Sequence, residues 1–417
     1  MKNPRKFIEQ INQRRIWFCN INQEQVWNDS KVFPGLTDSN QLQLIKQQEQ
    51  QMLLIASLED TVLLHNHLDE QYIAYLKQEG IELPQLLPIQ ELNHTIPLAL
   101  LRKSAFIPYM QTEETTKFTK SATMSTIFES DQQLTKDLNN KFITRRLAMK
   151  NGFKVTSGYF CKNIEGLRSA FHSLIEEGFD KVVLKIPFGS SGKGLKVIED
   201  VKTFEMTLKF IAKRSSAFEL LLEGWYSVQR HLNCQMLVQA DQVHQIAITE
   251  QKIDRNGVYL GTSFLPQYTE KILSEYQNEM ARLGSILSEI GYSGFVGVDS
   301  ILDKDGQMFP IIEINARFTQ VTYLLPFIME RLIEKYIFIE SQYIRLELKQ
   351  DVNFNEMKQL LDQQLLPDQS NNYFIYTYAT LINETITRYR IYLLFYGNSR
   401  SKIDEMILLF ERFQSMF

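Results

Sequence analysis

A segment rich in glycine and serine carries the clearest chemical signal in the sequence. It reads KIPFGSSGKG over residues 185–194, and its donors are glycine N–H groups, serine hydroxyls and one lysine: Gly189, Ser190, Ser191, Gly192, Lys193 and Gly194. Successive backbone N–H groups bind phosphate oxygens well where side chains do not obstruct them. The segment therefore predicts a loop that holds phosphate.

Lys185 stands at the end of an apolar, β-branched run, residues 181–186, that predicts a strand. There its ammonium would meet the α- and β-phosphates of a nucleotide as a fixed cation. The loop is not of the GxxxxGKS/T type, because neither Ser nor Thr follows Lys193 and a predicted strand, 195–198, comes next. Taken alone, this composition is equally typical of an ordinary surface loop.

A second set of polar side chains stands in two apolar strands predicted over residues 294–318. Glu313 and Asn315 are two apart in the second strand, so they project from one face, and Asp299 lies on the first strand. Magnesium bound to a nucleotide takes oxygen ligands from one or two carboxylates. Arg317 continues the same face and would bring a planar cation toward a transferred phosphoryl group.

The hairpin register decides whether Asp299 joins this set. A three-residue loop centred on Gly306 would place Asp299 opposite Glu313, whereas a two-residue turn would place it opposite Ile312, on the other face. We therefore predict an odd-length loop or a bulge at residues 305–307.

The alternative interpretation of these residues is a polar edge on a solvated sheet. The neighbouring runs GFVGV and FPIIEI instead resemble buried strands, in which a carboxylate is costly unless it is paired or binds metal. The DKDG sequence between them lacks the remaining positions of a calcium loop, so it predicts a hairpin turn.

The elements that must position these residues alternate along the chain and predict an α/β fold with α+β features. Residues 1–136 predict a small α/β domain with strands at 52–57 and 61–65 and a helix at 70–79. The glutamine-rich stretch 41–51 predicts a solvated helix or loop.

Residues 137–335 predict a second domain of two lobes, about 137–222 and 223–335. Its expected helices are 137–149, 164–177, 202–213 and 271–290, and its expected strands are 153–160, 181–186, 195–198, 218–224, 235–239, 245–249 and the 294–318 hairpin. Residues 336–417 predict a separate small α/β cap, with strands at 373–382 and 387–397 and a closing helix at 402–412.

Composition narrows the class of partner. A chain of 417 residues with 44% hydrophobic residues and a net charge of -4 gives no electrostatic reason to expect nucleic acid or a membrane. Three widely spaced cysteines, Cys19, Cys161 and Cys234, predict ordinary reduced thiols. The N-terminus lacks the apolar stretch of a secretory signal and no long apolar run occurs, so we expect a cytoplasmic protein; self-association stays open.

Four motifs in a fixed order resemble the ATP-grasp superfamily of carboxylate-amine ligases over about residues 137–326: Asn140-Lys141, KIPFGSSGKG, ELLLEGW and GVDS with PIIEINARF. The resemblance implies an ATP-grasp fold, preceded by a pre-ATP-grasp α/β domain and followed by a cap. It also implies ATP as cofactor, with Mg²⁺ or Mn²⁺.

The resemblance implies a role for each matching residue. Lys141 is similar to the lysine at the start of the first ATP-binding lobe, and Lys185 to the lysine before the phosphate loop. Glu223 stands where the adenine-and-ribose segment ends, with Glu219 as the alternative, and Lys252 is either a further phosphate contact or a solvent-facing lysine. The remaining positions match the three magnesium ligands and the catalytic arginine of the family: Asp299, Glu313, Asn315 and Arg317.

The N-terminal part resembles the domain that precedes the ATP-grasp fold in amino-acid and peptide ligases of biosynthetic pathways, including butirosin-pathway and pheganomycin-type ligases. The similar segments are HNHLDEQYIAYLKQEGIELPQLLPI and FIPYMQTEETTKF. His65 and His67 in the first segment are interpreted as ordinary loop residues, because a pair of histidines two positions apart is more often that than a metal site.

The implied reaction is phosphorylation of a carboxylate by ATP, followed by attack of an amine on the acyl phosphate and loss of phosphate. Catalysis then depends on cations and donors rather than on a nucleophilic Ser or Cys. The implied substrates are a small carboxylate and an amine, such as an amino acid or peptide, with a carrier protein or precursor peptide as an alternative. Two other interpretations stay open: transfer to a hydroxyl or thiol, or of phosphate itself, and a nucleotide-binding regulator without catalysis.

Overall fold

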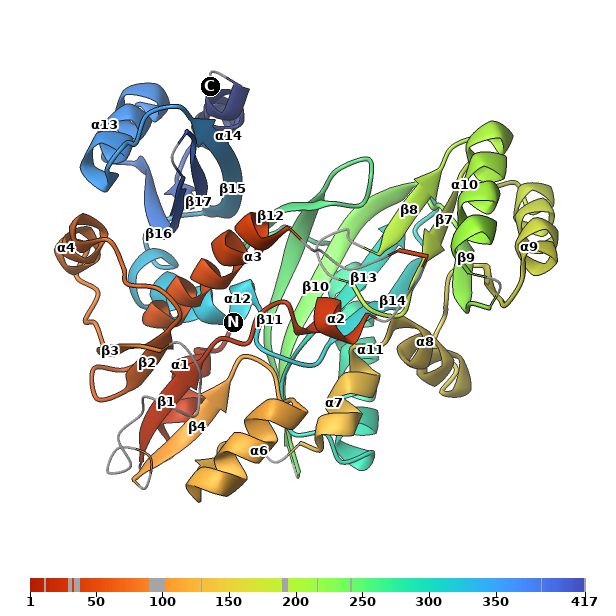
Figure 1. The fold of residues 1–417 in the computed structure, drawn as a ribbon, viewed down its shortest axis with the longest axis horizontal. Helices are drawn as coiled ribbons and strands as arrows, with labels where there is room; N and C mark the ends of the chain where they lie inside the picture. Colours follow the sequence, from red (N-terminus) through yellow and green to blue (C-terminus); the bar gives the residue numbers. More distant parts are fainter. Residues whose placement is uncertain are drawn as a thin grey trace.

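The chain forms three β-sheets with helices packed against them in the computed structural model (Figure 1). The structure describes residues 1–10, 13–28, 32–33, 38–89, 101, 103–128, 130–189, 194–215, 217–240, 242–383 and 385–415. The sheets follow one another along the sequence, so that each can be described with the segment that builds it.

The N-terminal segment builds a five-stranded parallel sheet in the order β3-β2-β1-β4-β5. Parallel strands need crossover connections, and helices lie in three of them, between β1 and β2, β2 and β3, and β4 and β5. This is the small α/β domain that the sequence predicts. Its elements are α1 (Pro4–Glu9), β1 (Arg14–Phe18), α2 (Gln23–Trp27), α3 (Ser39–Lys46), η1 (Gln47–Leu54), β2 (Thr61–Leu64), α4 (Glu70–Gln78), β3 (Gln85–Pro88), β4 (Ser104–Pro108), α6 (Glu113–Ala122) and β5 (Ser125–Thr126).

One prediction in this segment is wrong, and a second is wrong in part. Residues 52–57, predicted as a strand, lie in the 3₁₀-helix η1 and the turn after it, because a short, wholly buried apolar run does not distinguish helix from strand. The stretch 41–51 is helical, as predicted, but only its first part is solvated, since Gln43 is exposed whereas Gln47 and Gln50 are buried.

These two glutamines pair with the backbone of the C-terminal strand β16 (Asn371–Ile382). The Gln50 amide accepts from Tyr378 N at 2.7 Å and donates to Tyr378 O at 3.0 Å. The Gln47 amide accepts from Thr380 N at 3.0 Å and donates to Thr380 O at 2.7 Å. Because β16 is an edge strand, the two side chains satisfy backbone groups that an edge leaves open.

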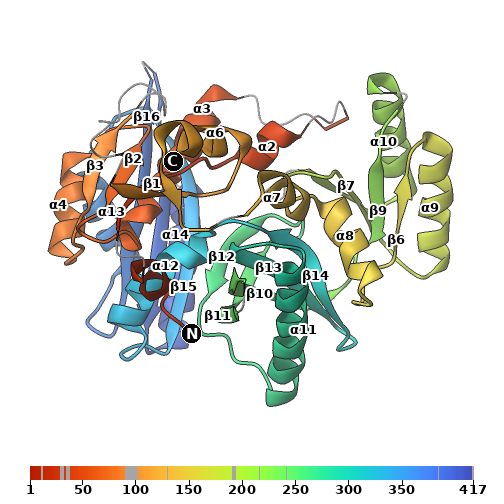
Figure 2. The same cartoon turned by 90° about the horizontal axis from the view of Figure 1, so that it is seen from below.

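The first lobe carries a four-stranded sheet in the order β6-β9-β7-β8, with helices α9 and α10 on its outer side (Figures 1 and 2). Its elements are α7 (Gln132–Leu138), α8 (Lys141–Lys150), β6 (Gly158–Cys161), α9 (Ile164–Glu176), β7 (Val182–Lys185), β8 (Leu195–Ile198), α10 (Val201–Arg214) and β9 (Leu220–Gly224). The helix predicted over 137–149 is broken, because the Asn140 side chain caps a new helix there. The strand predicted over 153–160 begins only at Gly158.

The third sheet has eight strands in the order β14-β13-β10-β11-β12-β15-β17-β16. The second lobe contributes β10 (Val228–Gln239), β11 (Gln242–Ile253), β12 (Tyr259–Ser263), α11 (Glu270–Glu289), β13 (Gly294–Asp303), β14 (Met308–Asn315), α12 (Gln320–Phe327) and η2 (Ile328–Leu332). The C-terminal segment contributes β15 (Phe338–Leu348), α13 (Phe354–Leu365), β16 (Asn371–Ile382), β17 (Thr387–Gly397) and α14 (Arg400–Ser415).

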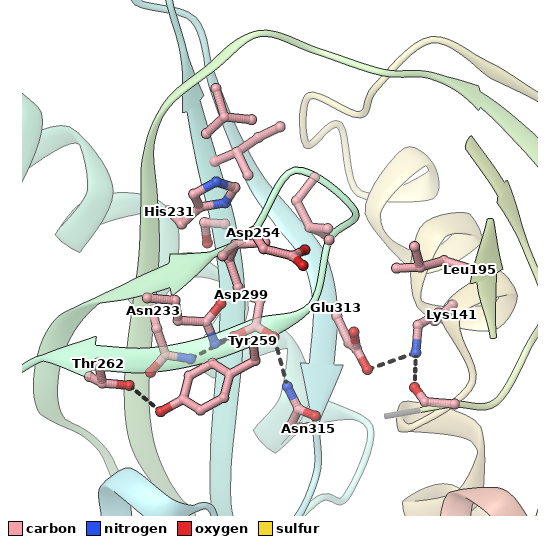
Figure 3. A pocket seen from close by; sticks show the side chains of 18 of the residues that line it. Lys141, Leu195, His231, Asn233, Asp254, Tyr259, Thr262, Asp299, Glu313 and Asn315 are labelled. Carbon is pink, nitrogen blue, oxygen red and sulfur yellow. Dashed lines mark hydrogen bonds and ion pairs between the residues drawn. The ribbon is translucent and has the colours of Figure 1, made fainter. Parts of the chain in front are cut away.

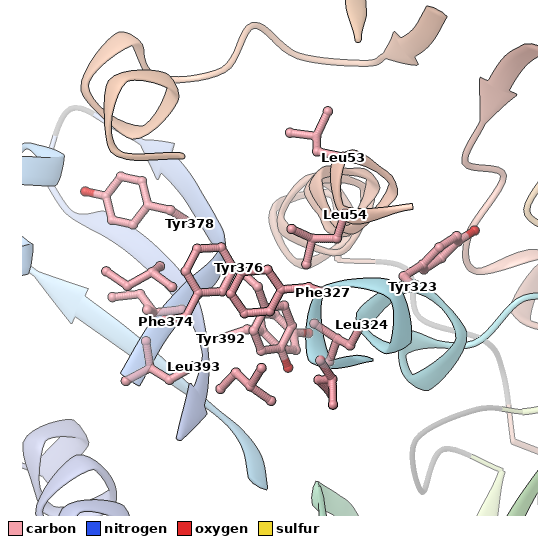
Figure 4. Packing of buried hydrophobic residues seen from close by; sticks show 14 of the residues in the cluster. Leu53, Leu54, Tyr323, Leu324, Phe327, Phe374, Tyr376, Tyr378, Tyr392 and Leu393 are labelled. Atoms are coloured by element: carbon pink, nitrogen blue, oxygen red, sulfur yellow. The ribbon is translucent and has the colours of Figure 1, made fainter. Parts of the chain in front are cut away.

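The C-terminal strands share the sheet of the second lobe. Ser263 of β12 pairs with Glu340 of β15, so residues from 336 onward extend this sheet instead of building one of their own. The apolar core crosses the same junction, since Leu54 of η1 lies near Phe327 of α12 and Phe374 of β16 (Figure 4). The Phe327 and Phe374 rings stack with centroids 4.4 Å apart.

Candidate active site

The β13–β14 hairpin places Asp299 directly opposite Glu313, as the register argument predicts. The turn has three residues between Asp303 and Gln307, whose backbones are hydrogen-bonded at 3.0 Å. It is therefore odd in length but centred one residue earlier than predicted. An irregularity in the pairing between residues 299 and 301 brings Asp299 back opposite Glu313. Pro310 lies on the facing strand at this point, and its missing N–H suits a break in the strand ladder.

Asp299 is half-buried in the cavity wall and surrounded by amide donors. Its carboxylate accepts from Asn233 Nδ2 at 2.7 Å, Gln251 Nε2 at 2.8 Å and Asn315 Nδ2 at 3.2 Å. Burial and the nearby charge of Glu313 raise the pKa of Asp299 to about 6. Two adjacent carboxylates with an amide oxygen beside them form a donor set that suits a hard divalent cation.

Lys141 joins this hairpin to the first lobe. It is the first residue of α8, and the Asn140 cap fixes the start of that helix by accepting from Phe142 N at 2.9 Å. The ammonium of Lys141 lies 2.7 Å from Glu313 Oε1 and 2.6 Å from Gly189 O (Figure 3). One lysine thus contacts both the carboxylate hairpin and the entrance of the glycine-rich loop.

Lys185 forms a buried network with Glu223. The Lys185 ammonium pairs with one Glu223 oxygen, while Arg145 and Thr156 bind the other, Thr156 at 2.7 Å. Burial opposes ionisation here, but the charges of Lys185 and Arg145 outweigh it and hold the pKa of Glu223 below its ordinary value. Glu219, the alternative to Glu223, pairs instead with Arg146 on the surface.

Arg317 is held by a residue from the N-terminal segment. Its Nε donates to Glu24 Oε1 at 2.8 Å, and its Nη2 donates to Asn315 Oδ1 at 2.7 Å. Its guanidinium also stands over the Tyr109 ring, 5.3 Å from the centroid. Glu24 is only 3% exposed, so the pair is a buried one that fixes Arg317 beside the hairpin.

Lys252 is not brought to this site. It pairs with Glu340 of β15, while its strand neighbours Gln251 and Ile253 line the cavity. Alternation along β11 turns position 252 to the opposite face, so the structure does not support the phosphate contact expected there. The predicted loop residues Ser190, Ser191, Gly192 and Lys193 lie outside the described residues.

A cavity of about 1000 Å³ connects the remaining predicted residues. It lies between the sheets of the two lobes and reaches the C-terminal strands. Its walls include most of the predicted site together with residues of the N-terminal segment: Glu24, Tyr109, Lys141, Lys185, Gly189, Glu223, Asp299, Glu313, Asn315 and Arg317.

Comparison with known proteins agrees with this arrangement. Residues 138–321 match the family model of the ATP-grasp domain. The chain is 37% identical over 361 residues to the [butirosin acyl-carrier protein]–L-glutamate ligase of Niallia circulans, which covers 87% of this chain and 85% of that protein. This chain belongs to the ATP-grasp superfamily of ligases.

Solved structures show that the fold of this ATP-grasp ligase extends over nearly its whole length. An N5-carboxyaminoimidazole ribonucleotide synthetase in complex with ADP has a TM-score of 0.60 at 12% identity, with 97% of this chain and 98% of that chain covered. An L-amino acid ligase from Bacillus licheniformis has a TM-score of 0.53 at 12% identity, with 96% of each chain covered.

Burial disfavours the nucleophilic form of the cysteines of this ATP-grasp ligase. Cys19, Cys161 and Cys234 are free and buried. Burial raises the pKa of the Cys161 thiol to about 11 and those of Cys19 and Cys234 further, which disfavours the thiolate form at neutral pH. Stabilisation by fixed charges is the chemistry that remains, as expected for an ATP-dependent ligase.

Sequence reasoning missed several residues that position the site. Arg145 follows Lys141 by one helical turn on α8, which is a usable signal in retrospect. Asn233 and Gln251 stand on strands β10 and β11, where alternation alone does not reveal the neighbouring Asp299. No sequence signal links Glu24 with Arg317. Within the part of the chain that the structure describes, no helix is long and apolar enough to cross a membrane.

Proposed function

We propose that this ATP-grasp ligase activates the carboxylate of an amino acid as an acyl phosphate and joins it to an acceptor presented by a carrier protein. The observation that carries the chemistry is the single cavity that brings Lys141 and Lys185 to the Asp299–Glu313 pair and Arg317. The substrate class is supported by the relative named as a carrier-protein–L-glutamate ligase, at 37% identity.

Each cation has a separate task in this proposal. Lys185 and Lys141 now bind Glu223 and Glu313, and both would bind phosphate oxygens when ATP enters. Arg317, fixed by Glu24, would stabilise the charge on the transferred phosphoryl group. Gly189, Ser190, Ser191, Gly192 and Lys193 are proposed as further phosphate donors, and Glu223 as the residue that ends the nucleoside pocket.

A divalent cation fits the carboxylate hairpin. Among the described residues no group of three or more His, Cys, Asp or Glu side chains is arranged for a metal, so the candidate set consists of two carboxylates and one amide. Asp299, Glu313 and Asn315 would hold Mg²⁺, and Mn²⁺ would suit the same oxygens. When bound, the ion neutralises charge on the β- and γ-phosphates.

The reaction balances without a covalent protein intermediate. A substrate carboxylate oxygen attacks the γ-phosphorus, the bond between the γ-phosphorus and the bridging oxygen breaks, and ADP leaves. The acceptor atom then attacks the carbonyl carbon of the acyl phosphate, which expels inorganic phosphate. We propose an amine as the general acceptor and place the reaction in the cytoplasm, where ATP is abundant.

An assay of ADP and phosphate release across a panel of amino acids, with and without a carrier protein, tests this function. Equal release of ADP and phosphate with a new acyl bond is the expected result. ADP without free phosphate would indicate a kinase instead. Tight ATP binding without turnover on any substrate would indicate a nucleotide-binding regulator.

A further inference from the structure

Strands β15 and β17 carry two tyrosines and two arginines on one face. Tyr343 lies opposite Tyr392, and Arg345 lies opposite Arg390. Alternate residues of a strand share a face, so the four side chains form one cross-strand group, which we call the Arg–Tyr quartet. All four line the cavity that holds the candidate active site.

The quartet places like charges opposite each other, which costs stability in an antiparallel pair. The next same-face position along the two strands is different, because Arg388 lies opposite Glu347 and donates to it at 2.8 Å. Among the described residues, neither Arg345 nor Arg390 takes part in an ion pair. Within that part of the chain, Arg345 and Arg390 therefore lack the counterion that Arg388 has. This difference suggests that an anion from outside the chain binds to the two arginines.

Arg390 is the stronger indication, since it is only 8% exposed. Its guanidinium lies over the rings of Tyr343 and Tyr392, at 4.8 and 5.3 Å from the centroids, and its Nε has no hydrogen-bond partner within the described part of the chain. A buried guanidinium normally has a carboxylate or carbonyl partner. Three other residues that line the cavity each have a buried polar atom without a hydrogen-bond partner in the described part of the chain: Gln51 Nε2, Tyr323 Oη and Tyr392 Oη.

Tyr392 locates the quartet relative to the rest of the molecule. It lies beside Tyr376 at the margin of the apolar core, with ring centroids 5.6 Å apart (Figure 4). Asp299, Glu313 and the two lysines belong to the other two walls of the cavity, on β13, β14 and the first lobe. A molecule whose carboxylate reaches the phosphoryl site would therefore need a second, separate anionic group to meet the quartet.

We propose that the Arg–Tyr quartet binds the second carboxylate of a dicarboxylic amino acid, the one that ATP does not activate. This inference rests on the proposed ligase function and adds the substrate class to it. Guanidinium groups match the planar carboxylate with two parallel hydrogen bonds. The two rings would contact the aliphatic part of the substrate, and the unpartnered donors would satisfy its remaining oxygens.

The experiment is steady-state turnover of the full chain with L-glutamate, compared with 4-aminobutyrate and L-2-aminobutyrate, each of which lacks one carboxylate. The variants are Arg390→Met, Arg390→Lys and the matched control Arg388→Met on the same strand face. We expect Arg390→Met to raise the KM for L-glutamate roughly 100-fold, with Arg390→Lys between it and wild type. The KM of Arg388→Met for L-glutamate should stay within about twofold of wild type, because Arg388 is bound to Glu347 and does not line the cavity. The KM for ATP should also stay within about twofold of wild type in each variant.

A stability measurement separates substrate binding from a structural role. Removing an uncompensated buried charge should leave the thermal midpoint of the substrate-free Arg390→Met protein equal to or above that of wild type. A fall in the midpoint, or an unchanged KM for L-glutamate, would overturn the inference and leave the ligase function standing.

Two further outcomes distinguish the alternatives. Efficient turnover of monocarboxylic amino acids by the wild-type protein would also overturn the inference. So would an Arg390→Met protein that uses L-glutamate normally but no longer binds 4′-phosphopantetheine. That second result would assign the quartet to the phosphate of a carrier arm. ATP binding without turnover of any amino acid would overturn the proposed function itself.

Discussion

Lys185 is the residue on which the phosphate-binding assignment depends. Its ammonium is held in a buried network with Glu223, so it is fixed in the cavity wall before a nucleotide enters. Lys193 belongs to the glycine-rich segment itself, where the sequence predicts it among the phosphate donors. Lys185 is therefore a cation that the fold places in the cavity wall, whereas Lys193 is one of several donors that the sequence predicts in the loop.

Lys185→Ala should lower kcat/KM for ATP by roughly 100-fold or more, since it removes a fixed cation from the phosphates. Lys193→Ala should lower it by less than about tenfold, because the loop keeps its backbone donors. Steady-state kinetics at varied ATP concentration measures both. Equal and negligible effects of the two substitutions would contradict the assignment of this segment.

Glu24 is the residue that fixes Arg317 from a distant part of the sequence. Glu24→Gln removes one member of a buried ion pair, which commonly costs about 3–5 kcal/mol of stability. It should also lower kcat by roughly tenfold or more, with a smaller change in the KM for ATP, because Arg317 is proposed to act on the transferred phosphoryl group. Kinetics and thermal unfolding of the purified variant separate the two effects.

The conservative variant Glu24→Asp serves as the control, because it keeps the charge and should recover part of kcat. A folded Glu24→Gln protein with the kcat of wild type would show that Arg317 needs no such anchor.

At the scale of elements, the pairing between η1 and strand β16 replaces a missing strand. Gln47 and Gln50 each make two hydrogen bonds to one residue of β16. Substitution of either glutamine by Met keeps the side chain's length but leaves a backbone N–H and a C=O without partners. We expect a loss of about 1–3 kcal/mol of unfolding free energy for each substitution, measured by urea denaturation.

Gln43→Ala is the matched control for these variants, because Gln43 lies on the neighbouring helix α3 and is exposed. It should change the unfolding free energy by less than about 0.5 kcal/mol. Equal stability of Gln50→Met and Gln43→Ala would mean that water satisfies the edge of β16 without the glutamines.

These elements also show what the sequence could and could not predict. Helices α9, α10 and α11 and strands β7, β8 and β9 lie within a few residues of their predicted limits, because caps, breakers and periodicity are local signals. Strand alternation predicted the shared face of Asp299 and Glu313, but their direct pairing also depends on the irregularity between residues 299 and 301, which the sequence predicts in the turn instead. Gln50 and Tyr378 are 328 positions apart and Glu24 and Arg317 are 293 apart, and no local pattern encodes such contacts.

At the scale of the whole molecule, the C-terminal segment is part of the structure that forms the site. Strand β15 pairs with β12, and the apolar core includes Leu54 from η1, Phe327 from α12 and Phe374 from β16. A segment that shares both a sheet and a core with the rest of the chain should not separate as an independent unit. We therefore expect the predicted boundary near residue 336 to mark a change in sequence pattern rather than a break in cooperativity.

Deleting residues 336–417 tests this expectation. The deletion removes three of the eight strands of the large sheet, leaves β12 as an open edge and exposes the apolar faces of η1 and α12. The truncated protein should be aggregated or should lack a cooperative thermal transition. In the full chain, residues 336–417 should unfold in the same thermal transition as the second lobe. A soluble 1–335 protein with a sharp transition and normal ATP binding would show instead that the C-terminal strands are a dispensable appendage.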